Sequence, residues 1–193
     1  MTGHLMSIAN RQPVELAVTA LDVQPTDNVL ELGFGSGLGL ALLGSRATDG
    51  VICGVDQSDE MVGQARRRNR AAIAAGRMEI VQGSFSRLGW PDGSFDAILL
   101  ANVIYFFDTA GTDISEVHRV LRPGGRIAVY ATDRSSMSRW PFCKPDTHRI
   151  FDRSQVEELL IQGGFARADI LLTSCRLALG IEGIIAMARK PAR

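Results

Sequence analysis

The chain of 193 residues is long enough for one domain with a sizeable core, and its 46% hydrophobic and 22% charged residues are typical of a globular protein. The 21 basic and 21 acidic residues balance, so no overall field draws the protein to nucleic acid or to anionic lipid. We expect no membrane span and no signal peptide, because no apolar run approaches about 18 residues and the first residues lack a basic and then an apolar segment. Three widely spaced cysteines, Cys53, Cys143 and Cys175, fit no zinc site and favour a cytoplasmic protein with reduced thiols.

Helical and strand-like segments alternate along the chain. An N-terminal helical segment (1–24), with a helix at 13–21, precedes a short buried strand at 29–32. A helix at 154–162 is predicted to open with a capping box of Ser154 and Glu157, and residues 132–150, which have no periodicity, are predicted to form a lid loop. The apolar periodicity predicts further helices at 40–47, 58–75 and 112–121, and strands at 51–55, 78–81, 95–101, 126–131, 168–172 and 177–188.

This alternation predicts an α/β fold in a single domain over residues 1–193. Strands separated by helices form a parallel sheet covered on both faces, so we expect a doubly wound, mostly parallel sheet of seven strands. The last two strands have no helix between them. They are therefore predicted to form an antiparallel hairpin at one edge of the sheet.

The most informative stretch joins the first strand to the next helix. It reads Glu31-Leu32 and then places a glycine at four alternate positions, 33, 35, 37 and 39. Glycines let a ligand lie against bare backbone, and the helix that follows presents unpaired N–H groups. The dinucleotide-binding fingerprint is absent, because the position that requires its third small residue is Leu38, Leu40 or Leu42 in the three possible registers.

This stretch resembles the first motif of the class I S-adenosylmethionine (SAM)-dependent methyltransferases. Asp56 follows the second strand, 23 residues after Gly33, where the family has an acid. The segment 116–125 resembles the helix-to-strand turn of small-molecule methyltransferases in that family. Together the matches cover about residues 29–131, and the seven-stranded sheet is the pattern of the family.

The resemblance implies the residues that hold SAM. The glycine loop would wrap the methionine half, Glu31 would support the loop and the amino group, and Asp56 would accept from the ribose hydroxyls. Ser84 stands where the family usually has an aspartate for the adenine amino group, so this side-chain contact departs from the pattern. The cofactor-binding set implied in this way is Glu31, Gly33, Phe34, Gly35, Gly37, Asp56, Gln57, Met61, Gly83, Ser84, Phe85 and Asn102.

Asp56 has a second interpretation. Its position two residues before Ser58 would also suit a structural cap at the start of the helix predicted at 58–75. A ligand-binding Asp56 predicts a loss of SAM affinity on substitution with little change in the stability of the empty protein. A structural cap predicts the opposite order.

The expected activity is methyl transfer from SAM to a small-molecule acceptor, with no metal and with the oligomeric state left open. A general base is needed only if the acceptor must lose a proton. Tyr105 and His148 are the two candidates for that role, and Trp140 and Phe142 in the lid loop are expected to line the acceptor pocket. The alternative is a SAM-binding regulatory or partner module without catalysis, which the substitution at Ser84 favours.

Two other signals favour a structural interpretation. The arginines at 66, 67, 68 and 70 spread around a helix rather than forming a stripe, and no aromatic residues lie among them, so we expect a solvated face and not a nucleic-acid surface. Asn102 and Tyr105 are spaced as in the Asn-Pro-Pro-Tyr motif of methyltransferases that act on amino groups of nucleic acid or protein. Both prolines of that motif are absent here.

Overall fold

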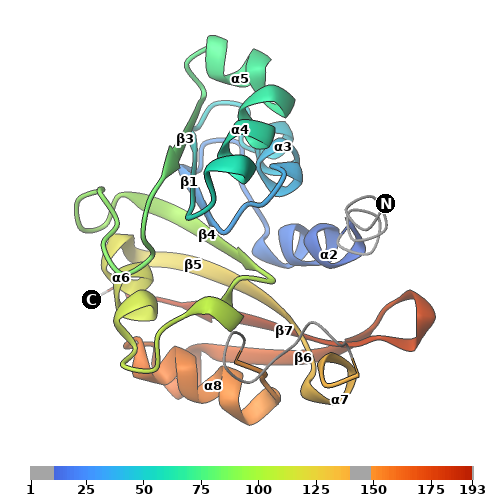
Figure 1. The fold of residues 1–193 in the computed structure, drawn as a ribbon. Helices are drawn as coiled ribbons and strands as arrows, with labels where there is room; N and C mark the ends of the chain where they lie inside the picture. The colour runs from blue at the N-terminus through green and yellow to red at the C-terminus, as the bar shows by residue number, and fades with distance from the viewer. Residues whose placement is uncertain (1–10, 140–148, 193) are drawn as a thin grey trace.

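The computed structural model describes residues 11–139 and 149–192 and contains one seven-stranded sheet in the order β3-β2-β1-β4-β5-β7-β6 (Figure 1). The first five strands pair in parallel, and β7 lies antiparallel between β5 and β6. The predicted fold class, including the antiparallel edge hairpin, is confirmed. The strands are β1 Val29–Leu32, β2 Ile52–Asp56, β3 Met78–Gln82, β4 Phe95–Ala101, β5 Leu121–Thr132, β6 Ile170–Arg176 and β7 Glu182–Arg189.

Helices cover both faces of this sheet (Figure 1). One core joins α2, α3 and α4 to one face, and a second core joins α6 and α8 to the other face. Among the described residues no helix is long and apolar enough to cross a membrane. The helices are α2 Arg11–Leu21, α3 Leu38–Arg46, α4 Asp59–Arg68, α5 Arg70–Ala74, α6 Thr112–Val120, α7 Arg134–Met137 and α8 Arg153–Gln162.

The alternation of side chains along β1 places its one acid on a defined face. Leu30 and Leu32 enter the core beneath α6 and α8, whereas Val29 enters the core beneath α2 and α3. Because successive strand residues point to opposite faces, Glu31 shares the face of Val29. Glu31 is therefore directed toward α3, the helix that follows the glycine loop.

The single helix expected at 58–75 is two helices, α4 and α5, that break at Asn69. The Asn69 side chain is buried, and its Nδ2 donates to the carbonyl of Ala65 at 3.0 Å and to the carbonyl of Gly37 at 3.1 Å. An asparagine side chain that bonds to backbone carbonyls in this way competes with regular helix geometry. At this break, the Asn69 side chain therefore joins the end of α4 to the glycine loop.

The remaining differences from prediction lie in the second half of the chain. Strand β5 begins at Leu121 rather than 126, because Leu121 pairs with Phe95 across an irregular register. The capping box of α8 uses Asp152 and Gln155 instead of Ser154 and Glu157, so the helix begins at Arg153. The short helix α7 occupies part of the predicted lid loop, and β6 and β7 are shifted to Ile170–Arg176 and Glu182–Arg189.

An arginine on β5 fastens the end of α2 to the sheet. Arg126 Nε donates to the carbonyl of Leu21 at 2.7 Å, and Nη2 donates to the carbonyl of Asp22 and to the buried carboxylate of Asp27. Arg126→Ala would leave the Asp27 charge buried without its partner. We expect a loss of about 3 kcal/mol in the free energy of unfolding, measured by urea denaturation. Arg126→Lys keeps the charge but lacks the planar fork, so it should recover only part of the loss.

Candidate active site

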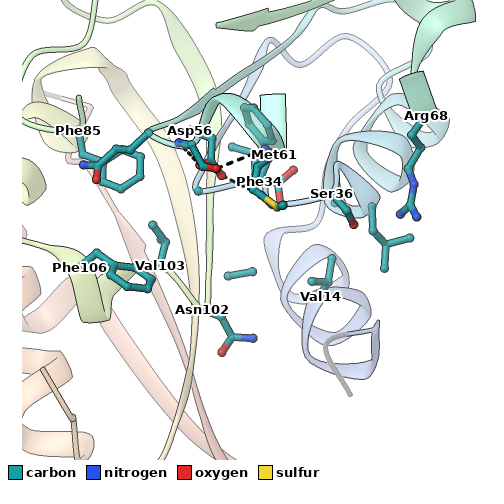
Figure 2. Close-up of a pocket in the computed structure, with 18 residues that line it drawn as sticks. Val14, Phe34, Ser36, Asp56, Met61, Arg68, Phe85, Asn102, Val103 and Phe106 are labelled. Atoms are coloured by element: carbon teal, nitrogen blue, oxygen red, sulfur yellow. Dashed lines mark hydrogen bonds between the residues drawn. The ribbon is translucent and has the colours of Figure 1, made fainter. Parts of the chain in front are cut away.

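A cavity of about 430 Å³ opens at the carboxyl ends of β1, β2 and β4 (Figure 2). This is the point in the sheet where the strand order reverses, since the chain runs from β1 outward to β3 and then returns to β4 on the other side. Ligands of open α/β sheets bind in the crevice at this point. The cavity is lined by Val14, Glu31, Gly33, Phe34, Gly35, Ser36, Leu38, Gly39, Asp56, Gln57, Ser58, Met61, Arg68, Phe85, Ala101, Asn102, Val103 and Phe106.

Asp56, the last residue of β2, holds two segments of the cavity wall together. One carboxylate oxygen accepts from the backbone N–H of Gly35 at 2.9 Å, and the other accepts from the N–H of Ser58 at 2.9 Å. Asp56 is only 8% exposed, although it lines the cavity. Asp56 therefore lines the cavity and also bonds to the start of α4. Each carboxylate oxygen has a second lone pair with which it can accept from a ligand.

Glu31 contributes a buried acid beside Asp56. It is 2% exposed, lines the cavity, and packs so closely on Gly39 of α3 that a Cβ atom at residue 39 would overlap its carboxyl group. Within the described part of the chain, Glu31 Oε2 has no hydrogen-bond partner. Burial, and then the neighbouring Asp56 carboxylate, raise the pKa of Glu31 well above its usual range. A buried acceptor without a partner favours a ligand that brings a donor or a positive charge.

The raised pKa of Glu31 predicts a stability that depends on pH. The folded protein holds the Glu31 proton more tightly than the unfolded chain, so stability falls as pH rises from the unfolded pKa through the folded one. Glu31→Gln mimics the protonated acid and does not ionise. Without cofactor, its advantage in melting temperature over the wild type should therefore increase with pH, as thermal unfolding from about pH 5 to about pH 9 would reveal.

The matched control is Glu60→Gln, which removes an exposed carboxyl group from α4. It should follow the pH profile of the wild type. Parallel profiles for wild type and Glu31→Gln would contradict a raised pKa at Glu31.

The opposite wall of the cavity comes from the end of β4. Asn102 has a left-handed backbone conformation (φ 56°), and Phe106, in the turn that follows, is 52% exposed and faces the cavity. Tyr105, a candidate catalytic residue, does not line the cavity and is only 5% exposed. Its hydroxyl donates to Asn102 Oδ1 at 3.1 Å and accepts from the backbone N–H of Thr132. Tyr105 therefore supports a wall residue from behind.

The structure brings nine of the twelve predicted cofactor residues to the cavity. Gly37 is not among them, because it packs against the end of α4, where a Cβ atom at residue 37 would approach Ala65 to 2.8 Å. Gly83 and Ser84 line a separate depression with Gln57 and Gln82. The second catalytic candidate, His148, and the expected lid residues Trp140 and Phe142 lie outside the described residues.

Several cavity residues were not predicted. Val14 lies on the apolar face of α2, where helical spacing indicates only that it is buried, and Arg68 belongs to the arginine run expected to be a solvated face. Two of these positions could have been predicted from the sequence. Ser36 lies between the glycines of the loop, and Val103 lies just after the end of β4, and residues at both kinds of position face the crevice in this class of sheet. The unpredicted residues are Val14, Ser36, Leu38, Gly39, Ser58, Arg68, Ala101, Val103 and Phe106.

Comparison with known proteins agrees with this geometry. Residues 30–129 match the methyltransferase domain family. The chain is 34% identical over 160 residues to an uncharacterized 37.1 kDa protein in transposon TN4556 of Streptomyces fradiae, covering 82% of this chain and 45% of that protein. It is 24% identical over 192 residues to the uncharacterized methyltransferase YdaC of Bacillus subtilis, which covers 100% of this chain and 99% of that protein. It is 38% identical over 110 residues to the demethylmenaquinone methyltransferase of Beutenbergia cavernae, which covers 57% of this chain and 42% of that enzyme.

Solved structures share the fold. One is a chain from the complex between the Haloferax volcanii Trm112 methyltransferase activator and a putative methyltransferase, with a TM-score of 0.78, 18% identity, and coverage of 97% of this chain and 92% of that chain. Another is a Burkholderia thailandensis 1,6-didemethyltoxoflavin-N1-methyltransferase, with a TM-score of 0.71, 20% identity, and coverage of 95% of this chain and 78% of that chain.

The fold, the glycine loop and the acids at the strand ends define a class I SAM-dependent methyltransferase. The chain belongs to the methyltransferase domain family, and its cofactor is S-adenosylmethionine. The features of the cavity fit that cofactor, because Glu31 offers an unpartnered buried acceptor and Asp56 offers a carboxylate in the cavity wall. The volume of about 430 Å³ lies within the range of small-molecule pockets.

Proposed function

We propose that this protein transfers the methyl group of SAM to a small-molecule acceptor. The observation that carries the proposal is the continuity of the cavity: the glycine loop, Glu31 and Asp56 form one wall, and the end of β4 with Phe106 forms the other. Relatives with small-molecule names support it, among them a demethylmenaquinone methyltransferase and a fatty-acid O-methyltransferase. The balanced charge of the chain gives no reason to expect a polyanionic acceptor.

The residues of the cavity suggest how SAM would lie. Asp56 would accept hydrogen bonds from the ribose hydroxyls, and Met61 and Phe85 would pack on the adenine. Glu31 would face the ammonium group of the methionine half. The methyl group would then point toward the end of β4, with Asn102 and Phe106 beside the acceptor.

The sulfonium group of SAM supplies an electrophilic methyl group. The task of the protein is therefore to align the acceptor in line with the sulfur–methyl bond and to exclude water. Phe85, Val103 and Phe106 present apolar surface suited to both tasks. The acceptor nucleophile needs a general base only if it must lose a proton, and no residue is assigned to that role.

The test combines SAM binding by calorimetry with a screen of metabolite extracts for label transferred from SAM. In Gly35→Arg, an arginine would enter the cavity, since nothing lies within 4 Å of the position of a Cβ atom there. Gly76→Arg is the matched control, because Gly76 also has a positive φ and open space but does not line the cavity. We expect binding and label transfer to be lost only in Gly35→Arg. Absence of SAM binding by the wild type at millimolar concentration would overturn the proposal.

A further inference from the structure

The methionine half of SAM ends in a carboxylate as well as an ammonium group. The two acids that line the cavity, Glu31 and Asp56, would repel that carboxylate. Among the described residues that line the cavity, only Arg68 has a basic side chain. The question of which group receives the carboxylate rests on the proposed function, because it presupposes that SAM occupies this cavity.

Arg68 is held at the cavity by the packing of its helix. It is the last residue of α4, and the next residue, Asn69, donates to the carbonyl of Gly37 at 3.1 Å. Gly37 has a left-handed backbone (φ 80°) and leaves no space for a Cβ atom against Ala65, so the last turn of α4 lies directly on the end of the glycine loop. Figure 2 shows Arg68 on the same side of the cavity as Ser36 and Val14, with Phe85 on the opposite side.

The neighbouring arginines have other environments. Arg66 Nη2 donates to the carbonyl of Ile80 at 2.8 Å, and the guanidinium of Arg67 lies alongside Gly63 of its own helix. Neither lines the cavity. Arg68 makes no hydrogen bond or ion pair with another residue of 11–139 or 149–192, so its guanidinium is available to a ligand. The four arginines at 66, 67, 68 and 70 are all exposed as expected, and Arg68 is the member of this run that also lines the cavity.

We infer that Arg68 binds the methionine carboxylate of SAM. A planar guanidinium can donate two parallel hydrogen bonds to a carboxylate, which is the strongest arrangement of this kind. Glu31 faces the ammonium group from the floor of the cavity, and Arg68 receives the carboxylate at the rim. Two protein charges of opposite sign then match the zwitterion, and Arg68 becomes the residue that distinguishes SAM from a decarboxylated analogue.

The experiment measures the affinity of two ligands by calorimetry. S-adenosylhomocysteine carries both charges of the zwitterion, whereas its decarboxylated analogue, S-adenosyl-3-thiopropylamine, lacks only the carboxylate. Arg68→Ala should weaken the binding of S-adenosylhomocysteine by about tenfold and leave the affinity for the decarboxylated analogue unchanged. Arg67→Ala, the matched control, removes an adjacent arginine outside the cavity and should change neither affinity.

The other outcomes overturn the inference in distinct ways. Equal weakening of the binding of both ligands by Arg68→Ala would mean that Arg68 acts on the shape of the site, and no change in either affinity would remove it from the cofactor site. If the affinity for S-adenosylhomocysteine were unchanged but turnover at saturating SAM were lower, Arg68 would contact the acceptor and not the cofactor. Failure of the wild type to bind either ligand would instead overturn the proposed function itself.

Discussion

Asp56→Ala should weaken SAM binding by at least about tenfold and should also lower the melting temperature of the cofactor-free protein. The affinity should fall because hydrogen bonds from the ribose hydroxyls to a charged acceptor are worth about 1.5–3 kcal/mol each. The stability should fall because the same carboxylate accepts from the backbone N–H groups of Gly35 and Ser58. The two interpretations that the sequence left as alternatives thus predict effects that appear together.

Calorimetry with SAM and thermal unfolding without SAM measure the two effects separately. Asp56→Asn keeps one oxygen acceptor and should lose less of each. Asp59→Ala is a suitable control, because it removes an exposed carboxylate three residues along the chain and should leave the affinity for SAM unchanged. An Asp56→Ala protein with wild-type affinity would remove Asp56 from the cofactor site.

Gly39→Ala should destabilise the protein by about 1–3 kcal/mol, even though alanine normally favours a helix over glycine. The added Cβ atom would overlap the buried carboxyl group of Glu31, which would have to leave its position against α3 and turn toward the cavity that it lines. Gly44→Ala, in the same helix, is the matched control. Its Cβ atom would make an ordinary contact of 3.5 Å with Met78, so helix propensity should make it neutral or stabilising.

Urea denaturation of the two variants tests this contact. Glu31→Ala should partly rescue Gly39→Ala, because it removes the group with which the new methyl overlaps, and the double-mutant cycle gives the coupling. If Gly39→Ala and Gly44→Ala were equally stable, the close contact between α3 and Glu31 would be contradicted.

The sequence predicted those parts of the site that depend on local order along the chain. Glycines at alternate positions after a strand, and an acid at the end of the next strand, mark the crevice because parallel strands bring their carboxyl ends to one edge. The position of Arg68 at the cavity was not predicted, because it depends on how α4 packs against Gly37, a contact between residues far apart in sequence. For the same reason the sequence did not reveal that Tyr105 lies behind Asn102 rather than in the cavity.

Local patterns also left real ambiguities. Two overlapping capping boxes are possible at the start of α8, and the sequence gives no basis for choosing the pair Asp152 and Gln155 over Ser154 and Glu157. The break at Asn69 was missed because apolar spacing continues through it. The tertiary bond from Asn69 to Gly37 decides that boundary.

The tethers of the glycine loop have a consequence for the cost of binding. A segment rich in glycine loses more conformational entropy on ordering than any other. Here Gly33 N–H bonds to the carbonyl of Val55, Gly35 N–H to Asp56, and the carbonyl of Gly37 to Asn69, so alternate residues are fixed by β2 and by the junction between α4 and α5. That entropy is lost when the chain folds, and a preorganised loop leaves less to be lost when the ligand arrives. The amides of Gly33 and Gly35 should accordingly exchange slowly with solvent deuterium even in the absence of SAM.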